Sequence, residues 1–463
     1  MTTLKKEFTF MDTLALIVAS IIGSGIFLTP NVAYKEVGSP AMLLLVFALT
    51  GVWSLLAQLC YAELGTLIPR SGAEYAFYKY AFGTGLPAFM LSWISCTVIR
   101  ALSLSIVMLT FARYSVAPFV GDCGLTDWAY KLIAIATLGL VCTINCISVK
   151  WLAKAQRVFF ALKIAALGGI ALMGFVALGQ KRQSYLSQGF NGTSTSIGGI
   201  TVAFYGAQWA FLGWSEANNF VQELSDPKIL VKAAFLAIPI VTLCYELVIV
   251  AYMAILPEDT FRNSKAVAVA AGKEMIGSAA LYIFPLIVSM SCFASAIGIL
   301  LASSRLVHEA GKYGDLPPVL GLVHNTLVTP IFAVWAQCLF PVVFIALVDV
   351  YSLVTLLGFT SGVVISASMF VLLKLRRAEP NTQRGIKVPI ILPIIVLIPS
   401  VVFAIVPFVR SPLKTGLTAL AMMSSIPIYF VAVSRRWGTK LHPWLNRASE
   451  WTVVIAQRFF NVS

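Results

Sequence analysis

The sequence predicts an all-α integral membrane protein with about twelve transmembrane helices. Composition is the first reason: 59% of the 463 residues are hydrophobic and 11% are charged, whereas roughly 25% of the residues of a soluble domain are charged. A soluble chain this apolar would have too little polar surface to stay dissolved. The second reason is that apolar runs of about 20 residues, the length that crosses a bilayer, follow one another along the chain with short connections.

These runs place the expected spans. Six lie in the first half, at 10–34, 40–68, 84–115, 128–147, 151–178 and 197–222, and six in the second, at 229–256, 278–310, 330–349, 351–374, 388–410 and 413–435. No long polar stretch, linker or low-complexity segment interrupts the series. We therefore expect residues 1–463 to form one transmembrane domain, with a cytoplasmic tail at 436–463.

The basic residues lie at the edges of these spans, so the net charge of +14 does not indicate a nucleic-acid partner. Placing both termini in the cytoplasm puts most Lys and Arg residues on the inner side, as membrane topology requires. Lys374, Arg376 and Arg377 follow this bias, whereas Lys181 and Arg182 go against it. The sequence thus predicts a multi-pass protein with cytoplasmic termini.

Glycines interrupt two spans at corresponding places, near mid-membrane. The first span contains Gly23-Ser24-Gly25, and the sixth contains Gly206 and Gly213. Unpaired backbone at that depth is tolerated only where it is buried in protein or lines a cavity, and a matched pair of interrupted helices indicates a transporter binding site. Half-helix N-termini would bind a carboxylate and half-helix C-termini an ammonium group, which suits an amino acid. The alternative is that these glycines only allow close helix packing.

Several motifs resemble the amino acid–polyamine–organocation transporters, and most closely the light chains of heteromeric amino acid transporters, the L-type family. Ile21–Phe27 resembles the signature of their first helix. Further matches are spread over nearly the whole chain, at Cys60–Thr66, Ser71–Tyr75, Asn145–Trp151, Ala302–Leu306 and Ile386–Pro389.

This resemblance implies a LeuT-type five-plus-five inverted repeat with helices 1 and 6 broken, comprising residues 10–178 and 197–374, with two additional helices within 388–435. It implies sodium-independent, obligatory exchange of neutral, large or aromatic L-amino acids across the plasma membrane by alternating access. A proton-coupled or uniporting amino acid permease and a cationic amino acid exchanger that uses Glu216 remain alternatives. A channel would need a continuous polar stripe or a charged ring, and neither is seen in the sequence.

The two breaks supply the expected substrate-binding residues. Trp209 takes the place of an aromatic lid over the substrate in the family, and Leu212 stands where relatives that accept cationic amino acids have an acidic residue. Because the segment after Trp214 is one residue longer than in the family, the roles of Ser215, Glu216 and Asn219 stay open. The predicted substrate-binding set is Ile22, Gly23, Ser24, Gly25, Ile26, Trp209, Leu212, Gly213 and Ser215.

Charged residues within spans are costly and therefore indicate functional sites. By resemblance, Lys163 either replaces a sodium ion between the first and fifth helices or extends to the inner membrane interface. We expect Arg100, which the family follows with proline and this chain with alanine, to lie in a wet cavity or in a structural pair. Glu216 either recognises a substrate amine or, as we expect, faces the inner vestibule. Glu246 lies where the family is apolar, and with Glu216 it would support proton coupling.

Cys123 is the one of the eight cysteines that falls in an expected outer loop, where an unpaired thiol indicates an intermolecular disulfide. Its position resembles the one at which these light chains bond a single-span heavy-chain glycoprotein; a free loop cysteine is the alternative. Asn191-Gly192-Thr193 is a glycosylation sequon in the next outer loop. The three histidines lack metal-ligand spacing and no phosphate-binding loop is present, so we expect neither an enzyme nor a cofactor.

Overall fold

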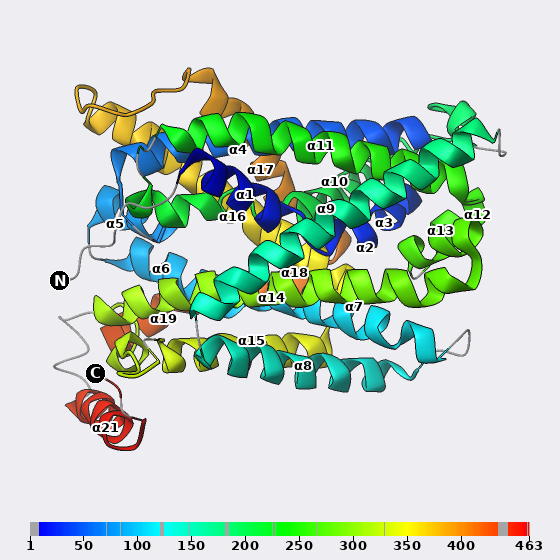
Figure 1. Cartoon of the computed structure of the whole chain (residues 1–463). Helices are drawn as coiled ribbons and strands as arrows, with labels where there is room; N and C mark the ends of the chain where they lie inside the picture. The colour runs from blue at the N-terminus through cyan, green and yellow to red at the C-terminus, as the bar shows by residue number, and fades with distance from the viewer. Residues whose placement is uncertain are drawn as a thin grey trace.

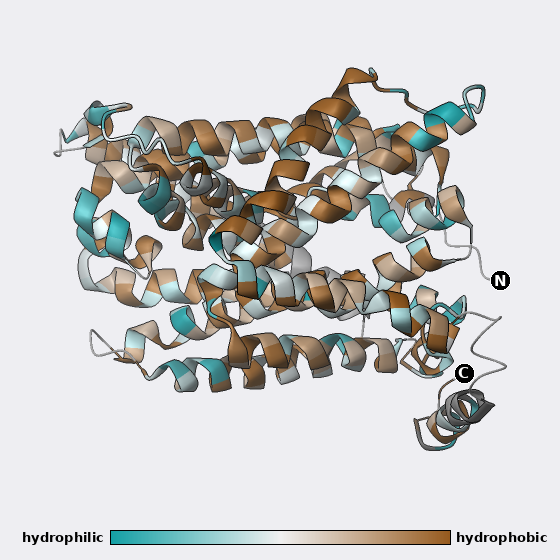
Figure 2. Cartoon of the chain, turned by 180° about the vertical axis from the view of Figure 1, so that it is seen from behind, coloured by the Kyte–Doolittle hydropathy of each residue, from teal (hydrophilic) through white to brown (hydrophobic). Residues whose placement is uncertain are grey.

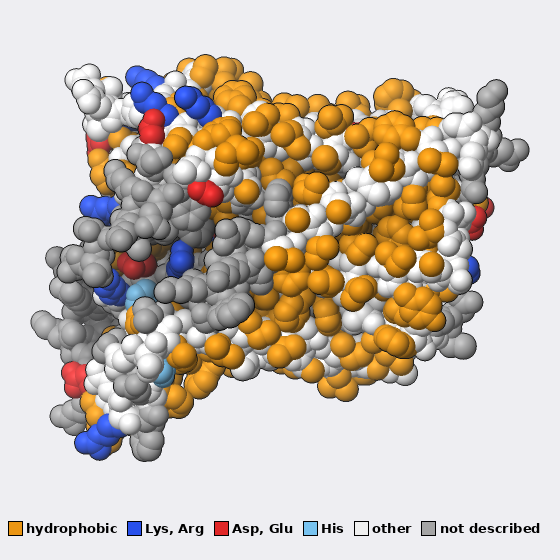
Figure 3. All heavy atoms as spheres, viewed as in Figure 1, with side chains coloured by type: hydrophobic (Ala, Val, Ile, Leu, Met, Phe, Trp, Pro, Cys, Tyr) orange, Lys and Arg blue, Asp and Glu red, His pale blue; other side chains and the backbone are white. Residues whose placement is uncertain are grey.

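The computed structural model describes residues 9–70, 72–83, 85–120, 125–147, 149–180, 185–224, 226, 228–264, 266–327, 329–433, 443–460 and 462. Within these ranges, nine helices are long and apolar enough to cross a bilayer, and Ile331–Leu347 is a shorter apolar helix. The helices run side by side in one bundle (Figure 1). Apolar residues dominate their middle parts (Figure 2), and on the face shown in Figure 3 the visible charged side chains lie at the two ends of the bundle. The predicted all-α membrane fold is confirmed.

The helix bounds follow the predicted spans closely in most places. In the first half the helices are α1 (Phe10–Ile21), α2 (Gly25–Leu28), α3 (Pro30–Val37), α4 (Pro40–Leu67), α5 (Glu74–Phe82), α6 (Leu86–Ile94), α7 (Arg100–Val120), α8 (Asp127–Ile147), α9 (Val149–Gly179) and α10 (Ile197–Phe211). In the second half they are α11 (Ile229–Ile255), α12 (Glu258–Asn263), α13 (Val267–Ile276), α14 (Ala280–Lys312), α15 (Ile331–Leu347), α16 (Val350–Ala378), α17 (Ile391–Arg410), α18 (Pro412–Met423), α19 (Ser425–Ile428) and α21 (Pro443–Phe460).

Three segments outside the expected spans contain helices. The connection between the second and third spans contains α5, the one between the seventh and eighth contains α12 and α13, and the expected cytoplasmic tail contains α21. The spans did not include them because their apolar residues are too few or too interspersed with polar residues to resemble a membrane span. A turn of π-helix, η1 (Ser95–Ile99), also joins α6 to α7.

The first predicted break is present between α1 and α2. α1 begins at a capping box formed by Thr9 and Asp12 and ends where Ile22 takes an extended conformation. Gly25 is the first residue of α2. A Cβ at this position would lie 2.3 Å from the Cα of Ala210, which is too close for any side chain. The close approach of the two broken helices therefore requires glycine at this position.

The second predicted break follows α10. This helix starts at the Ser196 cap and ends at Phe211, and a turn then leads to the short 3₁₀ helix η4 (Glu216–Glu223). Within the turn, Gly213 has φ of 115°, and a Cβ would lie 2.4 Å from the carbonyl oxygen of Ser20 in α1. Each broken helix thus presses a glycine against the other, which places both breaks at one point of the bundle.

An ion cluster, here called the Glu63 cluster, fixes the end of α4 to the segment between α16 and α17. The fully buried Glu63 carboxylate accepts bonds from Arg376 Nε at 2.9 Å, Arg384 Nη1 at 2.8 Å and the amide of Val388 at 2.9 Å. Arg376 Nη2 makes a further contact with it. Every oxygen of the buried charge is satisfied, so the cluster stabilises this end of the bundle.

Candidate functional site

The two breaks line a cavity of about 180 Å³ in the middle of the bundle. Its walls come from α1 and its break, the start of α7, α9, the end of α10 with the turn after it, and α14. On α1 it extends from the break back to Leu16, and on α14 it extends from Ala294 to Ala302. The cavity therefore reaches from the breaks toward the end of the bundle where the N-terminus lies (Figure 1).

Tyr245 of α11 holds the two half-helices together beside this cavity. Its buried hydroxyl lies 3.1 Å from the carbonyl oxygen of Ile21 and 2.9 Å from that of Ala210. These are carbonyls near the ends of α1 and α10, which have no partner within their own helices. The tyrosine thus shares its one hydroxyl proton between the two helix ends and fixes the distance between them.

Three polar groups on the cavity wall have no protein partner among the described residues: Ser24 Oγ, Trp209 Nε1 and Arg100 Nε. A buried polar group without a hydrogen bond costs free energy. The amides that open α2 also cannot bond within their own helix. The cavity is therefore suited to a small solute that carries its own hydrogen-bonding groups.

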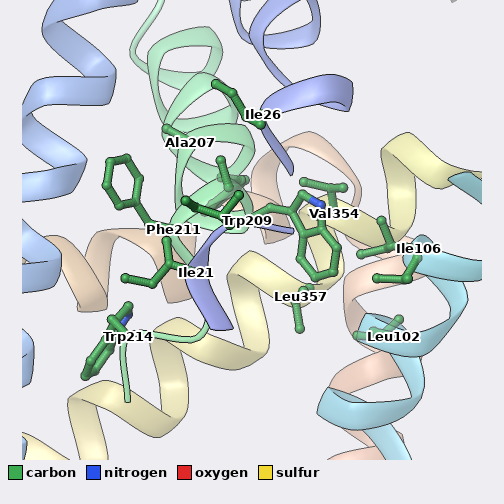
Figure 4. Close-up of a cluster of buried hydrophobic side chains, with 14 of the residues drawn as sticks. Ile21, Ile26, Leu102, Ile106, Ala207, Trp209, Phe211, Trp214, Val354 and Leu357 are labelled. Carbon is green, nitrogen blue, oxygen red and sulfur yellow. The ribbon is translucent and has the colours of Figure 1, made fainter. Parts of the chain in front are cut away.

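Trp209 closes one side of the cavity. Figure 4 shows its ring running from α10 toward Val354 and Leu357 of α16, with Ile106 of α7 nearby. The ring is 6% exposed, and the space between it and α16 is too small for a water molecule. A bulky ring at this place excludes water from that side of the cavity.

Arg100 and Glu216 form an ion pair on the cavity wall. Arg100 Nη1 lies 2.6 Å from Glu216 Oε1, and the two side chains are 15% and 19% exposed. Asn219 Nδ2 donates to the other carboxylate oxygen at 3.0 Å. The expected structural pairing of Arg100 is confirmed, and the arginine also lines the cavity. For Glu216 the sequence left open whether it recognises a substrate amine or faces the inner vestibule. Its pairing with Arg100 was not predicted.

Lys163 of α9 also lines the cavity. Its side chain is 3% exposed, and Nζ donates to Ser295 Oγ of α14 at 3.2 Å. Ser291, one turn earlier on α14, donates to the carbonyl oxygen of Gly23 at the first break, at 3.4 Å. The alternative in which Lys163 extends to the membrane interface is therefore wrong, because the ammonium group is buried toward the break.

The cavity collects most of the predicted substrate-binding residues. Gly23, Ser24, Gly25, Trp209, Leu212 and Gly213 line it, together with Lys163. Ile22 and Ile26 are fully buried in the core instead, and Ser215 contributes its carbonyl oxygen to Asn218. Neither isoleucine nor Ser215 is among the lining residues.

The remaining candidates lie elsewhere. Glu246 of α11 is half-buried, its Oε1 has no partner among the described residues, and it does not line the cavity. Asn191 is exposed in a turn after the short helix η3 (Tyr185–Gln188). Cys123 lies outside the described residues. The seven other cysteines are free thiols.

Comparison with known proteins decides the family. A family model described as amino acid permease matches residues 8–433. The chain belongs to the amino acid permease family. Because this family moves amino acids across membranes, the protein is an amino acid transporter and not an enzyme.

Relatives of known function support the L-type resemblance. The permease is 33% identical to the b(0,+)-type amino acid transporter 1 of Mus musculus over 450 residues, which are 97% of this chain and 91% of that protein. It is 34% identical to the mouse large neutral amino acids transporter small subunit 2 over 434 residues, 93% of this chain and 81% of the relative. The mouse Asc-type amino acid transporter 1 is 32% identical over 453 residues, 97% and 85% of the two chains.

Proposed function

We propose that this permease exchanges neutral L-amino acids, preferably large or aromatic ones, across the plasma membrane without sodium. The observation that carries the proposal is the cavity between the two helix breaks, with its unpaired polar groups and its mainly uncharged wall near Trp209 and Leu212. The amides that open α2 would bind the substrate carboxylate, and the carbonyl ends of α1 and α10 would face the ammonium group.

The neutral preference rests on the charges present. Leu212 is half-buried and supplies no charge to the cavity, and the carboxylate of Glu216 is already paired with Arg100. A lysine or arginine substrate would lose its hydration without a free counter-ion, a cost of several kcal/mol. An apolar side chain would instead gain about 25 cal/mol for each Å² removed from water. This argument disfavours the alternative of a cationic exchanger that uses Glu216.

Independence from sodium rests on Lys163. Its buried ammonium group supplies a fixed positive charge beside the first break, through Ser295. A fixed cation there makes a bound sodium ion unnecessary. If sodium does not bind, the sodium gradient cannot drive uptake. Exchange of one amino acid for another is therefore the expected transport mode.

We further propose that Cys123 bonds a single-span heavy chain on the outer side and that both termini are cytoplasmic. The glycosylation sequon at Asn191, which is expected in an outer loop, supports this orientation. Ser194, three residues later, bonds to the carbonyl oxygen of Val37 at the end of α3, at 2.8 Å. Figure 1 places that end of α3 opposite the N-terminus. A glycan on Asn191 and a disulfide at Cys123 would then lie on the same side of the membrane.

Counterflow in proteoliposomes tests the transport mode. Vesicles that contain the permease and are loaded with leucine should take up labelled leucine or phenylalanine at least tenfold faster than empty vesicles, equally in sodium and in choline and with or without a pH gradient. Equal rates in loaded and empty vesicles would show a uniporter. Acceleration by an inward proton gradient would show proton coupling, and a strict need for sodium would contradict the role of Lys163. Lys163→Ala should abolish uptake, whereas Lys131→Ala, whose ammonium group bonds Ala346 away from the cavity, should not.

Substrate competition tests the selectivity. Leu212→Asp should raise uptake of arginine relative to leucine, and Leu212→Asn, which adds a polar group without charge, should not. A wild-type protein that already prefers arginine would contradict the neutral assignment. Trp209→Ala should slow all substrates, because it opens one side of the cavity without changing its charge.

Non-reducing electrophoresis of the permease expressed with its partner tests the assembly. The larger band should disappear with reductant and in Cys123→Ser, and it should persist in Cys338→Ser, a matched loss of a thiol within the membrane. Persistence of that band in Cys123→Ser would refute the disulfide. Resistance of the Asn191 sequon to glycosylation in cells would argue against the orientation.

A further inference from the structure

The Arg100–Glu216 pair joins two groups of helices across the substrate cavity. Arg100 opens α7, which packs against α14, α15 and α8, whereas Glu216 opens η4, which packs against α1, α4 and α11. Figure 1 shows α7, α8, α14 and α15 together on one side of the bundle and α1, α4, α10 and α11 on the other. A direct contact across this boundary must break whenever the two groups move apart here.

The pair also lies on one side of the breaks. Arg100 and Val107 both line the cavity, and Arg100 precedes Val107 by two turns, so the Cα of Arg100 lies about 10 Å farther along α7, toward the N-terminal end of the bundle. Trp209 bounds the cavity toward α16 instead. A solute that leaves the cavity toward the N-terminal end passes between α7 and η4.

The backbone next to the pair is irregular on both walls of the cavity. Gly213, with φ of 115°, precedes Glu216 by three residues and separates α10 from η4, so a rotation there would carry Glu216 without moving α10. On the other wall, the π-helical turn of η1 ends directly before Arg100, and such turns are frequent at functional sites. Arg100 Nε has no hydrogen-bond partner among the described residues, so a single hydrogen bond, from Nη1, joins the two side chains, while Glu74 attracts the guanidinium electrostatically.

We propose that the Arg100–Glu216 pair is the gate of the substrate cavity on its N-terminal side. The pair is closed in this structure, and it separates when η4 and the N-terminal half of α1 move away from α7. Asn219 keeps the carboxylate oriented while the gate is open, through its bond to Oε2. The inference rests on the transport function proposed above, but its test does not require any particular substrate or transport mode.

The test measures access to the cavity. Ala294→Cys places a reporter thiol on the cavity wall at the level of the first break, where the alanine is fully buried, and a membrane-impermeant maleimide is added to the N-terminal side of proteoliposomes. The labelling rate of the parent chain without this cysteine is subtracted. Glu216→Gln should raise the rate at least fivefold, the lower end of a typical conformational coupling, and Glu216→Asp should raise it less because the shorter side chain keeps its charge. Labelling from the opposite side should fall correspondingly.

Two further variants separate a gate from a simple structural contact. The exchanged pair, Arg100→Glu with Glu216→Arg, should return the rate toward that of the parent. Asp349→Asn removes an exposed ion pair with Lys414 far from the cavity wall and should leave the rate unchanged. An unchanged rate in both Glu216 variants, or an equal rise in Asp349→Asn, would overturn the gate. If labelling changes as expected while counterflow fails, the gate stands and the proposed exchange does not.

Discussion

The Glu63 cluster and the Arg100–Glu216 pair use the same chemical groups in different ways. Glu63 is fully buried and accepts bonds from two arginines and a backbone amide. Glu216 accepts one bond from an arginine and one from Asn219, and both side chains of the ion pair keep some exposure in the cavity. A saturated buried carboxylate favours one conformation, because breaking it leaves buried charges unpaired. A single, partly solvated contact can open at a lower free-energy cost.

Loss of the Glu63 charge is the largest effect we expect. Glu63→Gln leaves Arg376 and Arg384 buried without a counter-charge, and this should destabilise the protein by about 3–5 kcal/mol. The fraction of monodisperse protein after heating in detergent micelles measures this. Arg377→Gln, a change at a neighbouring exposed arginine, is the control. A Glu63→Gln protein with wild-type heat resistance would remove the contrast between the two sites.

Glu216→Gln should show the opposite balance of effects. Its loss of stability in the same heating assay should be about 1 kcal/mol or less, because the pair is partly solvated, whereas uptake in proteoliposomes should fall at least tenfold. The double change Arg100→Gln with Glu216→Gln should cost no more stability than the single one. A stability loss equal to that of Glu63→Gln would show that the pair is structural.

Asn219→Ala should have the smallest effect of the three. It removes the hydrogen bonds from Asn219 Nδ2 to Glu216 Oε2 and to the Glu216 carbonyl oxygen, together worth about 1 kcal/mol, and keeps the ion pair. Uptake should fall about threefold, with a loss of heat resistance no larger than that of Glu216→Gln. Asn191→Ala, on an exposed turn away from the cavity, is the matched loss of an asparagine. A tenfold fall for Asn219→Ala would mean that the orientation of the carboxylate matters as much as its charge.

The sequence predicted the membrane helices and both breaks because these depend on local properties. An apolar run needs a certain length to span a bilayer, and Gly23, Gly25 and Gly213 interrupt the runs in which they lie. The partner of Arg100 could not be predicted in the same way, because Glu216 is 116 residues away and the pairing depends on how α7 and η4 pack. Tyr245 gave no signal either, since a tyrosine in an apolar span ordinarily indicates packing. The charge of Lys163 did stand out, and only its surroundings had to come from the structure.

The reciprocal contacts of Gly25 with Ala210 and of Gly213 with Ser20 have a consequence for how this chain can vary. Neither contact depends on which amino acid the protein carries, because in each a backbone atom of one helix occupies the space that a side chain would need. In a library of random variants selected for growth on different amino acids, positions 25 and 213 should therefore remain glycine under every selection. Position 212, by contrast, should change with the nutrient supplied.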